Sequence, residues 1–302
     1  MSAVFEGTAR SSDMLAWVTP LGPGLVALLL LAALMHATWN ALIKSDPDRL
    51  ASFGVLMLTG GLLGLVALPF VPPLAKEAWP YVAGSILLHN VYYFFLLRSY
   101  RFGDLSHVYP IARGIGPLLV AAASASVLGE RLGLLDASGV ALVSGGILSL
   151  SLANGIPRGD EIRPTAYALA TGVTIAAYTV VDGLGARHTP SAFSYIVWLN
   201  LLEGPWMIGL AVWRRGRRIV PHLRQYAWRG AIGGVVAVAG YGIAIWALTQ
   251  GTMANVAALR ETSVLFASLI GTLWLGEAFG RWRVFAAALV VAGLLVMNLA
   301  RG

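Results

Sequence analysis

The sequence predicts an all-α integral membrane protein with ten transmembrane helices in two inverted five-helix repeats. Of its 302 residues, 58% are hydrophobic and 12% are charged, whereas a soluble domain carries about 25% charged residues. The mean hydropathy is +0.75. Charged residues form short clusters between apolar runs of about 20 residues, the length that a helix needs to cross the hydrocarbon layer. No segment alternates with the period of two that membrane β-strands require.

The apolar runs predict the position of each span. The first five are Leu25–Ile43, Leu50–Phe70, Tyr81–Leu97, Leu105–Leu128 and Leu134–Ala153. The second five are Thr165–Val181, Ala192–Val212, Trp228–Leu248, Met253–Leu275 and Trp282–Leu299. The predicted organisation is therefore a proline-broken N-terminal tail over 1–23, a first repeat over 24–153, a linker over 154–164 and a second repeat over 165–302.

An internal repeat is visible when the chain is shifted by 147 residues. Arg113 then falls on Arg260, and the pair Gly129-Glu130 falls on Gly276-Glu277. Shared apolar composition does not produce an intramembrane arginine and a Gly-Glu pair at one offset. Because each half has five spans, the second half enters the membrane from the opposite side. The sequence therefore predicts the inverted repeat that many secondary transporters share.

The loops divide the positive charges unequally. Five lie on the side of both termini: Arg10, Lys76, Arg131, Arg187 and Arg301. The other side carries fourteen, most densely between Arg214 and Arg229. Since cytoplasmic loops are enriched in Lys and Arg, we expect a multi-pass protein of the cell inner membrane with both termini outside.

Several function classes have no support in the sequence. There is no cysteine, so disulfides and thiol chemistry are excluded. No phosphate-binding loop, nucleophile elbow or metal-ligand spacing is present. The basic pI near 10.0 reflects loop charges beside spans, which attract anionic lipid headgroups rather than nucleic acid. We expect no enzyme, cofactor or metal, and a gradient or exchange as the energy source.

Two arginines lie within predicted spans. Arg113 and Arg260 each lie about two turns inside a span, where an arginine costs about 2.5–3.5 kcal/mol. Either they bind an anionic group of the substrate, or they pair with internal carboxylates and lock the halves together.

Three acids are candidates for proton coupling: Glu203 in the seventh span, Glu261 in the ninth and Asp182 at the end of the sixth. Glu261 points about 100° away from its neighbour Arg260 on a helix, so it is available to another helix or to a proton. For Glu203 the alternative is an arginine partner.

Polar and aromatic residues inside spans complete the predicted substrate site. His36 and Asn40 share one helix face, and further polar and aromatic side chains lie in other spans. The remaining candidates are Trp39, His89, Tyr92, Tyr93, Tyr109, Tyr178 and Tyr241. Trp246 is a further candidate for the cavity wall. For the histidines the alternative is hydrogen-bonded packing.

Two further patterns predict a structural role rather than a role in substrate binding or proton coupling. Glu130 and Glu277 follow spans at the interface, where a carboxylate caps a helix or pairs with a base. Ala141-x-x-x-Gly145 and Ala288-x-x-x-Ala292 are small-residue pairs, which predict close packing between the halves or a homodimer face.

Several of these motifs resemble the drug/metabolite transporter superfamily, specifically its EamA-type ten-helix members. The residues are His36-Ala37-Thr38-Trp39-Asn40, Tyr109-Pro110-Ile111-Ala112-Arg113 with Pro117, Arg260-Glu261-Thr262-Ser263 and the two Gly-Glu pairs. The resemblance implies a proton-coupled or exchange carrier with a cavity lined by spans one, three, four, six, eight and nine. It also implies cytoplasmic termini, from which the loop charges of this chain depart.

The expected function is secondary active transport of small anionic or zwitterionic metabolites such as amino acids, organic acids or phosphonates. The expected partners are this substrate and membrane lipid. The alternative is a lipid-linked headgroup translocase (a flippase) of the same fold.

Overall fold

The computed structural model describes residues 22–103, 105–151, 159, 162–275 and 280–299, and all regular structure in these ranges is helical. Most of the predicted N-terminal tail and linker, together with Glu277, lies outside the described residues.

The helices follow the predicted apolar runs. They are α1 (Pro23–Lys44), α2 (Arg49–Ala67), α3 (Trp79–Phe102), α4 (Leu105–Leu128), α5 (Leu134–Ser149), α6 (Ile162–Arg187), α7 (Ala192–Arg215), α8 (Ile219–Ala247), α9 (Met253–Glu261), α10 (Ser263–Leu275) and α11 (Arg281–Leu299). Short 3-10 turns, η2 (Leu68–Phe70), η3 (Lys76–Ala78) and η6 (Gly216–Arg218), adjoin helix ends. Several predicted boundaries differ. The run Met253–Leu275 is broken at Thr262, and α8 begins at Ile219 rather than Trp228. Helix α3 ends at Phe102 rather than Leu97, and α6 ends at Arg187 rather than Val181.

Local chemistry accounts for several helix ends. Proline occupies the first turn of α1 and α3, where its missing N–H costs no helical hydrogen bond. The Asp48 side chain caps α2 by accepting from the Ala51 N–H at 3.2 Å. Gly216, with φ +54°, ends α7 in a conformation that a residue with a Cβ rarely adopts.

The chain is a membrane protein. Seven described segments are helical, long and apolar enough to cross a bilayer. One of them, Ala192–Ala247, runs through both α7 and α8 over 56 residues, whereas Leu134–Ser149 is apolar but shorter. Large apolar side chains also point outward, with Phe70 84% and Leu273 84% exposed. Such surfaces fit lipid, since soluble monomers rarely expose extensive apolar patches.

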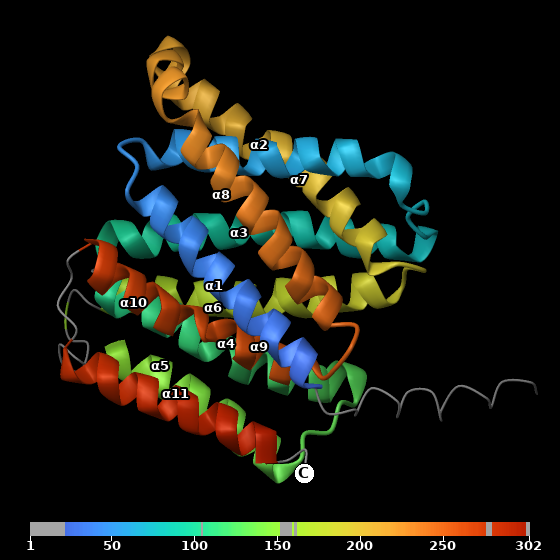
Figure 1. Cartoon of the computed structure of the whole chain (residues 1–302), viewed down its shortest axis with the longest axis vertical. Helices are drawn as coiled ribbons and strands as arrows, with labels where there is room; N and C mark the ends of the chain where they lie inside the picture. The colour runs from blue at the N-terminus through green and yellow to red at the C-terminus, as the bar shows by residue number, and fades with distance from the viewer. Residues whose placement is uncertain (1–21, 104, 152–158, 160–161, 276–279, 300–302) are drawn as a thin grey trace, which may run out of the picture.

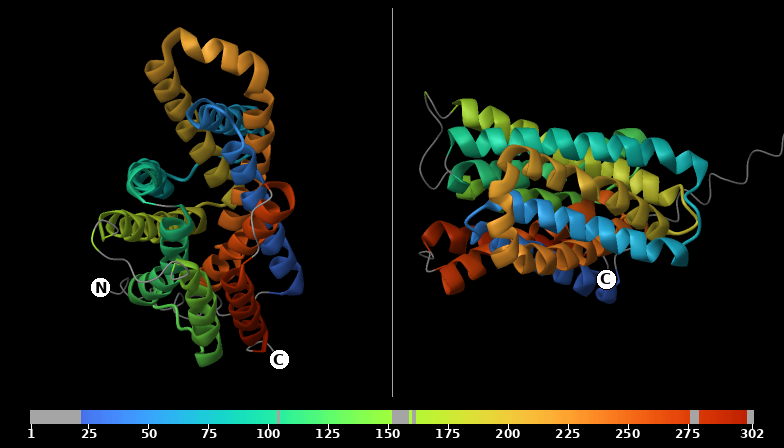
Figure 2. Two further views of the ribbon diagram at one scale, coloured as in Figure 1. Left: turned by 90° about the vertical axis from the view of Figure 1, so that its left-hand side faces the viewer. Right: turned by 90° about the horizontal axis from the view of Figure 1, so that it is seen from above.

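The helices form a row along the long axis of the molecule (Figure 1). The packed pair α2 and α7 lies at one end, and the packed pair α5 and α11 lies at the other. Between them, α3 packs on α6, and α1 packs on α8 and crosses the bundle obliquely. The connection between α7 and α8 projects from the end of the row (Figure 2).

Glycines allow the closest helix contacts. A Cβ on Gly61 of α2 would lie 3.1 Å from the Gly204 Cα of α7. In the same way, a Cβ on Gly293 of α11 would lie 2.7 Å from the Gly139 carbonyl oxygen of α5. These contacts need backbones that approach without side chains between them.

The small-residue motifs are not the residues that make this contact, so that part of the prediction is wrong. Helices α5 and α11 do pack together, but Ala141, Gly145 and Ala288 are exposed. A Cβ on Gly145 would meet nothing within 4 Å. The packed face is displaced by one residue, to Gly146, and the exposed small residues point away from the neighbouring helix.

Candidate functional site

The break between α9 and α10 places two charged residues inside the bundle. Arg260 and Glu261 are the last residues of α9, and Thr262 follows them. The Thr262 hydroxyl donates to the Leu259 carbonyl at 2.6 Å, and its backbone N–H donates to the same oxygen at 3.2 Å. This tight turn divides one apolar run into two helices. Discontinuous helices form many binding sites in transporters.

Arg113 of α4 meets Glu261 of α9. The distance from Arg113 Nε to Glu261 Oε2 is 2.8 Å, and both side chains are 5% exposed. These two atoms are not aligned as a hydrogen bond, so the contact is an ion pair. The Arg113 guanidinium also donates to the Ser263 hydroxyl at 3.3 Å. The pair joins the two predicted repeats, which is the structural alternative that the sequence left open for Arg113.

Arg260 has a different environment. Its guanidinium carbon lies 5.1 Å above the centre of the Tyr241 ring in α8. In the described part of the chain it makes no ion pair, and its side chain is only partly buried. Cation–π contact of this kind stabilises a guanidinium without neutralising its charge. The N–H groups at the edge of the Arg260 guanidinium can therefore bind an anion.

Asp182 of α6 is fully buried and accepts two phenol hydroxyls. Tyr195 of α7 donates to one carboxylate oxygen at 2.8 Å, and Tyr241 donates to the other. Tyr241 thus connects Asp182 to Arg260, because the same ring lies beneath the guanidinium. The arrangement satisfies a buried carboxyl by hydrogen bonds rather than by a paired cation.

Glu203 of α7 is also buried, and its described partner is the Tyr93 hydroxyl at 3.4 Å. The arginine partner that the sequence left open is not observed among the described residues. Two of the three candidate acids therefore meet phenols, and Glu261 alone meets an arginine.

Aromatic rings connect these charged groups. His89 of α3 stacks on Tyr178 of α6 at 4.2 Å and lies edge-on to Tyr241 at 5.9 Å. Tyr92 contacts Tyr93 at 5.1 Å and Tyr178 at 5.8 Å. The rings of α3, α6 and α8 thus form one continuous cluster, with Arg260 at its edge.

The cluster extends to α1 through α2. His36 lies 5.0 Å from Trp39, Trp39 lies 6.3 Å from Phe53, and Phe53 lies 5.3 Å from Tyr93. Phe53 was not predicted, because a phenylalanine in an apolar run gives no signal of its contacts. Tyr195 was not predicted either, and Ser263 was quoted in a motif without a role of its own.

Tyr109 lies outside the ring cluster, whereas Asn40 and His89 make hydrogen bonds within their own helices. Tyr109 packs against the core between α5 and α11. The Asn40 amide donates to the His36 carbonyl of its own helix at 2.8 Å. His89 forms a hydrogen bond with Ser85, one turn earlier in the same helix. The distance from the His89 Nδ1 to the Ser85 hydroxyl is 3.1 Å.

Glu130 lies in a second polar cluster near the ends of α4, α6 and α8. Arg187, the last residue of α6, contacts Glu130 at 3.0 Å, and the other Glu130 oxygen accepts from the Met253 N–H at 3.0 Å. The predicted structural role, as helix cap and ion-pair partner, matches these contacts. The helix that it caps is α9, not the following α5.

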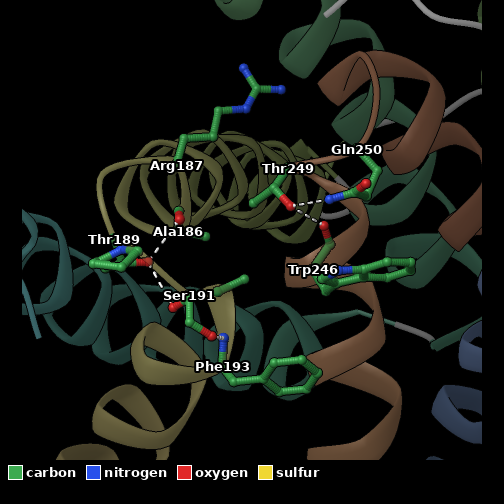
Figure 3. Close-up of a pocket in the computed structure, with 10 residues that line it drawn as sticks. Ala186, Arg187, Thr189, Ser191, Phe193, Trp246, Thr249 and Gln250 are labelled. Atoms are coloured by element: carbon green, nitrogen blue, oxygen red, sulfur yellow. Dashed lines mark hydrogen bonds between the residues drawn. The ribbon is translucent and has the colours of Figure 1, made fainter. Parts of the chain in front are cut away.

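A hollow of about 350 Å³ lies beside this second cluster (Figure 3). Its lining includes Phe193, Trp246, Thr249 and Gln250. Trp246 therefore lies at a helix end, away from the central rings. The Arg187 side chain points away from the hollow in Figure 3.

A bundle of apolar helices with a buried arginine, buried carboxyls and central rings is typical of polytopic membrane transporters. The model of the EamA-like transporter family matches residues 24–152 and 164–299. The chain therefore belongs to this family, which confirms the resemblance to EamA-type drug/metabolite transporters. Its members are membrane transporters, so the class of function is transport.

Solved structures agree on the fold. One, described as "Crystal structure of protein", aligns over 97% of this chain and 98% of its own length, with a TM-score of 0.69 and 20% sequence identity. At that identity the likeness shows the fold alone. No curated protein matches the chain.

Proposed function

We propose that this protein is a secondary active carrier of small anionic or zwitterionic metabolites, such as amino acids, organic acids or phosphonates. The substrate site lies among the central rings, with Arg260 as the anion-binding residue. Energy comes from a proton gradient or from exchange. The carrier resides in the cell inner membrane with its termini outside.

The architecture that we propose is ten spans in two inverted repeats, over 24–153 and 165–302. The contacts support it. Exchanging each helix for its counterpart in the other half converts the packed pair α3 and α6 into α8 and α1, which also pack. The pairs α2 with α7 and α5 with α11 map onto themselves. A site between two such halves can face either side of the membrane in turn.

One observation carries the assignment of the binding residue. Arg113 and Arg260 occupy equivalent positions in the repeat, but Arg113 is paired with Glu261, whereas Arg260 contacts only a ring among the described residues. An arginine inside an apolar bundle is costly unless it is paired. A substrate carboxylate or phosphonate that binds it bidentately offsets that cost.

Proton coupling is assigned to the buried carboxyls with phenol partners. Asp182 and Glu203 can each exchange a proton without leaving a paired arginine uncompensated, because their described partners are neutral. Glu261 is less suited, since its protonation leaves Arg113 as an unpaired buried charge.

The test is ligand-induced thermal stabilisation of the purified protein with a panel of organic anions, amino acids, phosphonates and lipid-linked sugars. A ligand that binds only the folded state raises stability with its concentration. We expect soluble anions to stabilise the wild type and Arg224→Ala, an exposed arginine control, but not Arg260→Ala. Stabilisation by lipid-linked compounds alone favours the flippase, and an unchanged response in Arg260→Ala contradicts the binding role.

A further inference from the structure

Helix α9 is held at both ends. At its C-terminal end, Glu261 pairs with Arg113, and Arg260 lies over Tyr241. At its N-terminal end, the Glu130 carboxylate accepts from the Met253 backbone N–H at 3.0 Å. A carboxylate at this position satisfies a free N–H and complements the helix dipole. Glu130 belongs to the connection between α4 and α5, so the cap comes from the other half of the chain.

Arg187 connects Glu130 to the turn before α9 through three hydrogen bonds. It donates through Nε to the Leu248 carbonyl at 2.9 Å, through Nη2 to the Gly251 carbonyl at 3.0 Å, and through Nη1 to Glu130 at 3.0 Å. The side chains of Arg187 and Glu130 are 11% and 6% exposed. We call the contacts among Glu130, Arg187 and the backbone of 248–253 the α9 knot. It ties the end of α6 and the connection after α4 to the turn between α8 and α9.

The segment between the knot and the central charges is short and buried. Every residue from Gly251 to Leu259 is buried, and α9 rises about 14 Å over its nine residues. Because close-packed interiors transmit strain, we expect movement of its N-terminus to displace Arg260 and Glu261 as well.

We propose that Glu130 and Arg187 are positioning residues, which hold α9 so that Arg260 and Glu261 face the central site. The α9 knot closes the face that carries both termini, and it breaks when that face opens. This inference rests on the proposed function only in placing the transport path through the centre.

A purely structural role makes a different prediction. If the knot only stabilises the fold, breaking it lowers the melting temperature without making α9 reachable. The hollow beside the knot offers a route for a reagent, because Thr249 and Gln250 line it and lie in the turn that accepts the Arg187 hydrogen bonds.

The absence of native cysteine permits a direct test by thiol labelling. Val256→Cys places a thiol in the middle of α9, where the native side chain is 0% exposed. Thr249→Cys, in the open hollow, is the positive control for access. A membrane-impermeant thiol reagent is applied in turn to each side of the membrane.

With the knot intact we expect slow labelling of Val256→Cys. Glu130→Gln is expected to accelerate it by about 10- to 100-fold from the face of the termini, since loss of a charge-assisted hydrogen bond shifts a two-state equilibrium by that order. Glu77→Gln and Arg131→Gln, exposed on the same face, should change nothing. The neutral double variant Glu130→Gln/Arg187→Gln should label as fast, and it avoids an unpaired buried charge if the single variant folds poorly.

The result that overturns the inference is a folded double variant that labels at the background rate, or faster labelling only from the opposite face. Labelling needs no substrate, so it separates this inference from the proposed function. If no anion binds but labelling rises, the knot stands as a gate and the substrate assignment fails. A substrate, once found, adds a second readout: the apparent KM should rise in Glu130→Gln and stay unchanged in Glu77→Gln.

Discussion

The two membrane-embedded arginines differ in their partners, although the repeat makes them equivalent. The sequence placed both inside spans and named both alternatives, substrate binding and internal pairing. It did not assign the alternatives, because Arg113 and its partner Glu261 lie on different helices in different halves. Side-chain partners across a bundle depend on helix packing, which apolar runs do not encode. Asp182 with Tyr195 is a second contact of this kind.

Removing one side chain of the Arg113–Glu261 pair should destabilise the protein more than removing both. Arg113→Ala or Glu261→Ala leaves an uncompensated buried charge, and such changes destabilise by about 3–5 kcal/mol. The double variant Arg113→Ala/Glu261→Ala should be more stable than Arg113→Ala. Melting temperatures in one detergent check this, with Arg224→Ala as the exposed control. Additive losses would show that the two side chains are not coupled.

The ion pair between Arg215 and Asp48, outside the spans, predicts a pH dependence. The hydrogen bonds from Arg215 to the Asp48 carboxylate, at 2.7 and 3.0 Å, lower the pKa of Asp48 below its usual value. A lowered folded-state pKa adds stability above the unfolded value near 3.9, and that contribution is lost as the pH falls through the folded-state pKa. The difference in melting temperature between wild type and Asp48→Asn should therefore be largest at neutral pH and shrink below about pH 4. A difference that does not depend on pH would mean that the pair does not act through this carboxylate.

The apolar runs predicted the positions of most helices, because contact with lipid and the length needed to span the membrane dominate their sequences. The break at Thr262 was not predicted, because no Pro or Gly marks a helix end among the polar residues of 260–263. The nine residues of α8 before Trp228 were missed because their charges were taken as a loop. The packed face through Gly146 was not predicted, because the adjacent Gly145 is equally small in the sequence.

Adjacent glycines in α5 provide a matched test of that packing. A Cβ on Gly146 would lie 2.9 Å from the Leu289 Cβ, whereas a Cβ on Gly145 would meet nothing within 4 Å. Gly146→Ala should destabilise by about 1–3 kcal/mol through overpacking. Gly145→Ala should be neutral or gain up to about 1 kcal/mol from helix propensity. Equal melting temperatures for the two variants would contradict the packing face.

For the whole molecule, orientation rests on loop charge. The prediction is that both termini lie outside, opposite to what the family resemblance implies. Thiol labelling checks this orientation in the cysteine-free chain. Glu77→Cys, at an exposed position on the side of the termini, should react from outside. Gln225→Cys, at an exposed position of α8, should react only from the cytoplasm. The reverse pattern would show that the family orientation prevails over the charges.

We propose that this protein binds small anions through Arg260 and couples their transport to protons. Counterflow in proteoliposomes, at two internal pH values, measures both parts together in wild type, Arg260→Ala and Arg224→Ala. We expect exchange of a soluble anion that depends on the pH gradient in wild type and Arg224→Ala, is absent in Arg260→Ala, and loses its pH dependence in Asp182→Asn or Glu203→Gln. Wild-type rates in folded Arg260→Ala, or no exchange of any soluble anion at either pH, would rule out anion transport through Arg260.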